Sequence, residues 1–204
     1  MQHPNRKITD HRKLRQLYES GAVFTAFDTE TTSITPTTGR IIELGAVKFT
    51  REGIIDTWNH LFDPDQFLSP FIISLTHITQ EMVDAEDPIE KHLPSFLSFI
   101  QNTILIAHNA QFDLNFLNAE CGKCGFPVTH NKVIDTLCLS RTVISEVQKH
   151  KLDYLADYLK INKGSSHRAL DDAKTCKELF ELCIKRISFG VPFADLSADH
   201  SGRP

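Results

Sequence analysis

The apolar segments of this chain follow one another in an order that few folds allow. Three short, partly β-branched runs come first, and they predict strands over residues 22–27, 40–49 and 54–62. The segment TREG separates the second run from the third, which predicts a β-hairpin. Helical and strand-like patterns then alternate, with further strands predicted over 103–107 and 132–135. Helices are predicted over 8–18, 79–84, 89–100, 109–124, 136–146, 152–159 and 168–187. This order indicates an α/β domain with a mixed sheet whose early strands are antiparallel.

Length and composition fit one soluble domain. The chain has 204 residues, 41% hydrophobic and 24% charged, and no apolar run approaches the ~20 residues that span a bilayer. We expect a polar lead-in over 1–20, one domain over 21–188 and a mobile tail over 189–204. The basic residues near the start precede no apolar segment, which argues against a secretory signal. Five cysteines without a disulfide-like spacing suit a reducing compartment, so we expect a cytoplasmic protein without a membrane partner.

The net charge limits how the chain could hold a nucleic acid. Its 22 basic and 26 acidic residues give a formal charge of −4, whereas proteins that grip nucleic acid along a groove usually carry a basic excess. A nucleic-acid substrate would therefore be held over few nucleotides, through metal ions, or with the help of a partner.

Carboxylates gather at the ends of predicted strands and at the starts of predicted helices. Asp28 and Glu30 close the first strand two residues apart, so both leave it on the same face. Asp113 stands in the first turn of the helix after the fourth strand, and His167 and Asp172 flank the start of the last helix. Each group alone is more typical of a solvated strand end, or of an acidic first turn that complements the helix dipole, than of a functional site.

Together, the four carboxylates and the histidine predict a hydrolytic metal site. Clustered carboxylate oxygens prefer hard cations, Mg²⁺ or Mn²⁺, rather than zinc. Two such ions about 3.5–4 Å apart form an arrangement used for displacement at phosphorus. A neighbouring histidine is suited to accept the proton of the attacking water. The residues therefore point to phosphodiester hydrolysis.

The three clusters stand in segments that resemble a known family. FDTETT, HNAQFDLNFL and HRALDDA are similar to the three motifs of the DEDDh, or DnaQ-like, 3′–5′ exonucleases, in the family's order. The segments GRIIELGAV, ITQEMV, VIDTLCLSR and HKLDYLADYLKI most resemble the proofreading epsilon subunits of bacterial DNA polymerase III, and also the exonuclease domain inserted in certain Gram-positive replicative polymerases. The resemblance covers residues 22–187. It implies an RNase H-like α/β fold, a five-stranded mixed sheet with flanking helices.

The resemblance also implies a role for each clustered side chain. Asp28 would bridge two Mg²⁺ or Mn²⁺ ions, Glu30 and Asp172 would complete the tighter metal site, and Asp113 would hold the second ion through water. His167 would be the general base. The implied reaction is metal-dependent hydrolysis at a DNA 3′ end, which releases nucleoside monophosphates.

Four further residues are implied to contact the substrate. The backbone around Thr31 would meet the terminal 3′ nucleotide, Asn109 and Phe112 would line its pocket, and the segment that contains His77 would pack on the terminal base. Ser33 replaces the glycine that usually follows the first motif, which would strain the turn if this position needs a positive φ.

Three biological contexts remain open on the sequence. The resemblance favours a proofreading nuclease that acts on single-stranded or frayed DNA 3′ ends beside a DNA polymerase catalytic subunit, which would supply the DNA affinity. A free-standing 3′ exonuclease for RNA or short oligonucleotides is the second, because the pocket shape that admits a 2′-hydroxyl is hidden in sequence. A catalytically silent, nuclease-like interaction module is the third, and the intact set of carboxylates and histidine argues against it.

Overall fold

Strand β1 (Phe24–Thr31) lies at the centre of a sheet ordered β3-β2-β1-β4-β5 in the computed structural model, which describes residues 5–165 and 167–189. β1 pairs antiparallel with β2 (Ile41–Thr50), and β2 pairs antiparallel with β3 (Gly53–Leu61). On its other side β1 pairs in parallel with β4 (Ile104–Ala107), which pairs in parallel with β5 (Val133–Asp135). The five-stranded mixed sheet confirms the predicted fold class.

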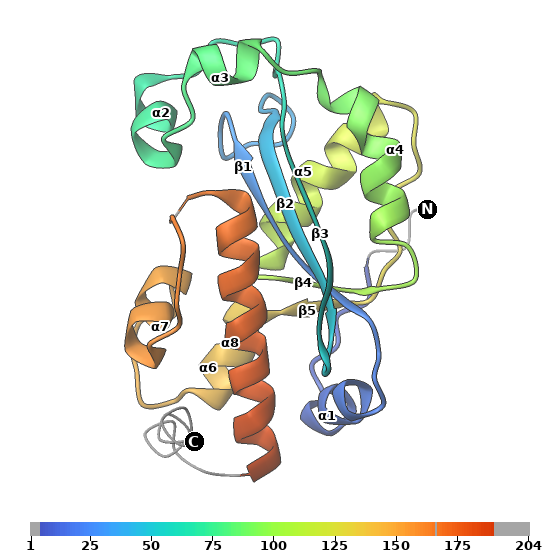
Figure 1. The fold of residues 1–204 in the computed structure, drawn as a ribbon, viewed down its shortest axis with the longest axis vertical. Coiled ribbons are helices and arrows are strands. Elements are labelled where there is room, and N and C mark those ends of the chain that lie inside the picture. The colour runs from blue at the N-terminus through green and yellow to red at the C-terminus, as the bar shows by residue number, and fades with distance from the viewer. Residues whose placement is uncertain (1–4, 166, 190–204) are drawn as a thin grey trace, which may run out of the picture.

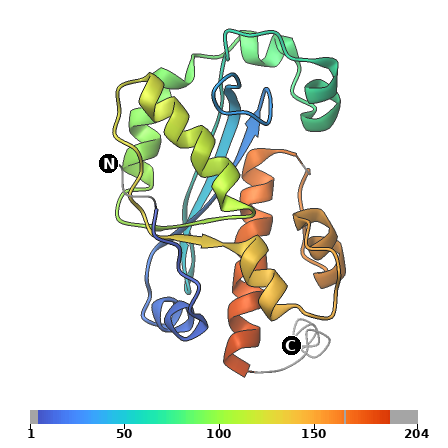
Figure 2. The same ribbon diagram turned by 180° about the vertical axis from the view of Figure 1, so that it is seen from behind.

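Helices cover both faces of this sheet, as Figures 1 and 2 show from opposite sides. The long helix α8 crosses one face, with α1, α6 and α7 packed beside it, while α4 and α5 cover the other face. The small helices α2 and α3 lie beyond one end of the sheet. The helices are α1 (His11–Glu19), α2 (Pro70–Thr76), α3 (Gln80–Asp84), α4 (Ile89–Phe99), α5 (Ala110–Lys123), α6 (Thr136–Val143), α7 (Leu152–Leu159) and α8 (Ala169–Phe189).

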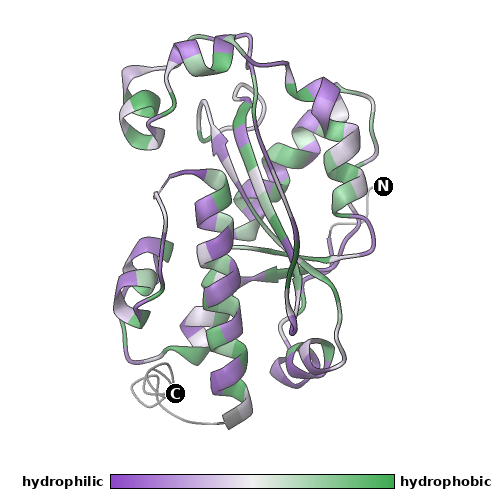
Figure 3. Ribbon diagram, viewed as in Figure 1, coloured by the Kyte–Doolittle hydropathy of each residue, from purple (hydrophilic) through white to green (hydrophobic). Residues whose placement is uncertain are grey.

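The alternation of side chains along β1 determines what each face of the sheet receives. Phe24 and Ala26 belong to the core under α8, whereas Phe27 belongs to the core under α4 and α5. Because strand side chains alternate, Asp28 and Glu30 continue the α8 face beyond its apolar part. Helix α8 carries both hydrophobic and hydrophilic residues along its length (Figure 3), as expected of a helix that packs one of its sides on a sheet.

A glycine in β2 lets the start of α8 approach the sheet closely. Gly45 stands opposite Asp28 in the antiparallel ladder. A Cβ atom at Gly45 would lie 2.2 Å from the backbone nitrogen of Leu170 and 2.4 Å from the carbonyl carbon of Ala169. Backbone atoms cannot move aside as a flexible side chain can. The first turn of α8 therefore packs this closely on β2, opposite Asp28, only because residue 45 lacks a side chain.

The N-terminal segment packs on the domain instead of standing apart from it. The backbone of residues 6–8 bonds to Val133 of β5, through Ile8 N–H to Val133 O at 2.8 Å and Val133 N–H to Arg6 O at 3.0 Å. Leu14 of α1 is buried in the core under α8. Residues 190–204, which hold nearly all of the predicted tail, lie outside the described residues.

The structure differs from the sequence-based expectations at α2 and at Ser33. Helix α2 is missing from the predicted elements, although Ser69 caps it by accepting from Ile72 N–H and Pro70 supplies its first residue. Ser33 is not among the residues with positive φ, so the strain considered for this position does not arise. In the described part of the chain, no helix combines the length and the apolar character needed to cross a bilayer.

Substituting Gly45 with alanine should disturb the fold at the place where α8 meets β2. We expect Gly45→Ala to lower the free energy of unfolding by about 1–3 kcal/mol, as over-packing does, which denaturant titration would measure. Gly122→Ala in α5 is the matched control, because a Cβ there meets nothing within 4 Å. It should stabilise the protein by up to about 1 kcal/mol through helix propensity. Equal stability of Gly45→Ala and wild type would show that α8 can move away freely.

Candidate active site

Three elements bring the predicted carboxylates to one end of the sheet. Asp28 and Glu30 extend from β1, Asp113 comes from the first turn of α5, and Asp172 from the first turn of α8. All four side chains line a single cleft of about 790 Å³, together with His167. The clusters that the sequence places up to 144 residues apart (172 minus 28) therefore form one site.

Asp113 is tied to the opposite face of β1. Thr29, between Asp28 and Glu30, donates to Asp113 Oδ1 from its backbone N–H at 3.1 Å and from its hydroxyl at 2.8 Å. The residue between the two strand carboxylates thus fixes the third one. The helix that carries Asp113 directly follows Asn109, which has a left-handed backbone (φ 68°) and whose side chain makes no capping hydrogen bond. Its N–H instead donates to Asp135 Oδ1 at 3.2 Å, which joins the ends of β4 and β5.

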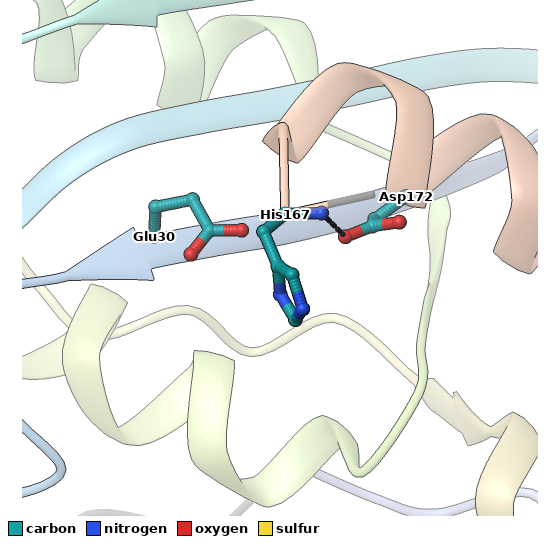
Figure 4. Close-up of side chains that lie close together, drawn as sticks. All are labelled: Glu30, His167 and Asp172. Carbon is teal, nitrogen blue, oxygen red and sulfur yellow. Dashed lines mark hydrogen bonds between the residues drawn. The ribbon is translucent and has the colours of Figure 1, made fainter. Parts of the chain in front are cut away.

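Figure 4 shows Glu30, His167 and Asp172 drawn together from β1 and from the start of α8. One ligand atom from each of the three lies within 4.8 Å of the others. The backbone N–H of His167 donates to Asp172 Oδ2 at 3.0 Å, and His167 has a left-handed φ of 62°. The histidine is thereby bent back toward the carboxylates in front of α8. In the described residues this is the one cluster of three potential metal-ligating side chains.

A buried ion pair next to His167 fixes this corner to the sheet. Glu43 of β2 is 1% exposed and stands opposite Glu30 in the β1–β2 ladder. Arg168 donates to both of its oxygens at 3.0 Å, and Ala169 N–H donates to Oε2 at 3.1 Å. A planar guanidinium that meets a carboxylate through two bonds defines an orientation as well as a distance. The pairing of Glu43 with Arg168 therefore positions His167, the residue that directly precedes Arg168.

Burial raises the pKa of every site carboxyl, and repulsion by the other site carboxylates adds to this at Asp28 and Glu30. Burial raises the pKa of Asp28 well above its ordinary value, and Asp113, Glu30 and Asp172 add to the effect. Burial, Asp172 and Glu43 raise the pKa of Glu30 to about 8. Burial raises the pKa of Asp113 to about 7 against the bonds from Thr29, and that of Asp172 to about 6 against the bond from His167. The site concentrates more negative charge than its own surroundings neutralise.

The cleft contains most of the predicted substrate-binding residues. Thr31, Asn109 and Phe112 line it, and His108 lies beside them. His77 does not line it: this exposed residue ends α2 in a left-handed conformation. The preceding turns of α2 contribute Phe71, Ile72, Leu75 and Thr76 to the cleft instead.

Sequence reasoning missed several residues that shape the site. Glu43 carried a usable signal, because a carboxylate inside the apolar run IIELGAV needs a buried partner. Arg168 stood in a quoted motif without an assigned role. Arg141, in the last turn of α6, and Lys151, directly before α7, also line the cleft. Both stand in segments that resemble the epsilon subunits, but the sequence assigned them no role.

The raised pKa values predict how stability depends on pH when metal is absent. A carboxyl that holds its proton more tightly in the folded state contributes stability below about pH 4, and this contribution is lost as the pH rises toward about 8. Glu30→Gln removes one such charge. In a chelator we expect its melting temperature to rise relative to wild type between these pH values, as thermal melts would record.

Divalent cations should reverse the order of the melting temperatures of wild type and Glu30→Gln. Binding to the native state stabilises by about 2.7 kcal/mol at a concentration 100 times the Kd, so Mg²⁺ or Mn²⁺ should raise the melting temperature of the wild type more than that of Glu30→Gln. If the difference in melting temperature between wild type and Glu30→Gln changed neither with pH nor with added cation, the charge repulsion described here would be contradicted.

Comparison with known proteins identifies the family. Residues 25–180 match the Exonuclease family RNase_T. The chain is 40% identical over 163 residues to the DNA polymerase III subunit epsilon of Treponema pallidum, covering 79% of this chain and 76% of that protein. It is 39% identical over 164 residues to the PolC-type DNA polymerase III of Caldanaerobacter subterraneus, covering 80% of this chain but 12% of the length of that relative.

Solved structures share the fold. Exonuclease X, in complex with 5′ overhanging duplex DNA, superposes with a TM-score of 0.62 at 25% identity, over 84% of this chain and 95% of that one. The nuclease domain of 3′hExo, a DEDDh family member bound to rAMP, gives 0.69 at 24% identity, over 83% and 94%. Exonuclease I gives 0.73 at 16% identity, over 86% and 43%. With four carboxylates and a histidine gathered at the positions its motifs predict, the chain belongs to the DEDDh 3′–5′ exonucleases of the RNase T family, related to the exonuclease domains of DNA polymerase III.

Proposed function

We propose that this chain hydrolyses the terminal phosphodiester bond at unpaired DNA 3′ ends, with two Mg²⁺ or Mn²⁺ ions, and releases nucleoside monophosphates. The observation that carries the proposal is the meeting of Asp28, Glu30, Asp113 and Asp172 with His167 in one cleft. The family implies divalent metal ions, and a hydrolase of this kind needs both charge neutralisation and a proton acceptor.

The donor set suits hard divalent cations. All the carboxylates are oxygen ligands. Burial, together with mutual repulsion at Asp28 and Glu30, disfavours their charged forms, and bound cations would offset this cost. Asp28, Glu30 and Asp172 would hold one ion, and Asp28 with Asp113 the other. When bound, such ions supply Lewis-acid stabilisation of the charge that develops on the phosphoryl oxygens.

His167 would accept the proton of the attacking water. Its ring stands within 4.8 Å of carboxylate oxygens of Glu30 and Asp172, which would stabilise the imidazolium form after the transfer. Its backbone is fixed on two sides, by its own bond to Asp172 and by the pairing of the next residue, Arg168, with Glu43. The base thus keeps its place without being held by the substrate.

The walls of the cleft suit one unpaired nucleotide chain. Thr31, Asn109 and Phe112 would surround the terminal nucleotide, with the Phe112 ring available for stacking on its base. The similarity to epsilon subunits and PolC-type polymerases supports a proofreading role next to a polymerase catalytic subunit, and the formal charge of −4 fits a nuclease whose partner supplies much of the DNA affinity.

Activity on defined strands tests this function. With Mg²⁺ or Mn²⁺, we expect a ladder that shortens 5′-labelled single-stranded DNA and mismatched primers from the 3′ end, faster than matched primers. Asp172→Asn should abolish the ladder while the protein remains folded by circular dichroism. Faster shortening of the RNA version would assign the chain to RNA processing instead, and no metal-dependent ladder on any strand would overturn the proposal.

A second variant separates proton transfer from metal binding. We expect His167→Asn to lower kcat about 100- to 10,000-fold, the usual contribution of a general base. Asparagine tolerates the left-handed backbone of residue 167. Calorimetric titration with Mn²⁺ should give the same binding stoichiometry as wild type. Loss of Mn²⁺ binding would make His167 a ligand or a structural support rather than the base.

A further inference from the structure

Two permanent cations line the cleft and have no role in the chemistry proposed above. Arg141 lies in the last turn of α6 and Lys151 directly precedes α7, and both are exposed. Neither forms a salt bridge or hydrogen bond through its side chain with any described residue. Lys91 and Lys177, by contrast, form salt bridges with Asp87 and Glu181. The charges of Arg141 and Lys151 are therefore available to an anionic ligand in the cleft.

Hydrogen bonds bring together the chain segments that carry these two cations. Arg141 directly follows Ser140, and Lys151 directly follows His150. A hydrogen bond joins Ser140 Oγ and His150 Nδ1 at 3.2 Å. His150 is in turn fixed to the end of β4, because its carbonyl oxygen accepts from His108 Nε2 at 2.7 Å. His108 is adjacent to Asn109, which lines the proposed nucleotide pocket. The wall that carries the cations is therefore attached to the same corner of the sheet as the pocket.

The opposite wall of the cleft has a different chemistry. It is formed by α2 and by the turn after β1, which contribute the exposed apolar side chains of Ile34, Phe71 and Leu75. In Figures 1 and 2, α2 and α7 lie on the same side of the molecule, on either side of the start of α8. A single nucleic-acid strand has the same asymmetry, with charged phosphates along one edge and apolar base faces along the other.

We propose that Arg141 and Lys151 bind the phosphates on the 5′ side of the scissile bond, so that the strand enters with its backbone against the α6–α7 wall and its bases against α2. The inference rests on the proposed function and adds a binding site to it. The four carboxylates repel an incoming polyanion before metal binds, and cations on one wall counteract this repulsion where the second and third nucleotides pass. The two side chains act on binding, and they do not touch the reacting atoms.

The test compares a substrate that has upstream phosphates with one that has none. Single-stranded DNA supplies them, whereas the p-nitrophenyl ester of thymidine 5′-monophosphate presents only the terminal phosphodiester. We expect Arg141→Gln with Lys151→Gln to raise the KM for the oligonucleotide roughly tenfold, with kcat nearly unchanged. Hydrolysis of the ester should equal that of wild type. Lys13→Gln, an exposed cation on α1 outside the cleft, is the control and should match wild type on both substrates.

Salt dependence provides a second measurement. Each contact to a single-stranded phosphate contributes about 0.7 to the slope of log(kcat/KM) against log salt, so the double variant should lose about 1.4. An unchanged slope and KM on the oligonucleotide would overturn the inference, and so would an equal loss on both substrates, which would indicate damage to the fold or the chemistry. A wild type inactive on both substrates would overturn the proposed function itself, together with this inference.

Discussion

The repulsion among four carboxylates at one end of the sheet is the constraint on which this structure depends. The fold holds these like charges close together, and three local contacts support the arrangement. Thr29 binds Asp113 across β1, the His167 backbone binds Asp172, and the Gly45 position lets α8 rest directly on the strand. Cations that bind to the folded state and neutralise these charges would therefore stabilise it.

The sequence predicted those parts that repeat or alternate. The hydrophobic pattern predicted every strand of the sheet, and strand alternation correctly predicted that Asp28 and Glu30 share one face. The resemblance added the sheet's size and the grouping of distant segments, which local patterns cannot supply. Helix α2 escaped prediction because a seven-residue helix shows too little periodicity, and its capping signal at Ser69 was outweighed by the prolines nearby.

Contacts that depend on three-dimensional proximity could not be predicted in the same way. Glu43 and Arg168 are separated by 125 residues, and nothing in either segment specifies the other. Arg141 and Lys151 are ordinary surface residues until the hydrogen bond between Ser140 and His150 folds their segment back on itself. The motifs thus describe the chemistry of the family, whereas the contacts that assemble the walls of the cleft are visible only in the folded structure.

The bonds between residues 6–8 and the edge strand β5 affect how the protein associates with other chains at high concentration. A sheet edge with free N–H and C=O groups invites a strand from another chain to add to it. Val133 lies on the outermost strand of one edge, and both of its outward backbone groups are already bonded to the N-terminal segment. The segment that looks like a polar leader in the sequence therefore shields this edge of the sheet against edge-to-edge aggregation.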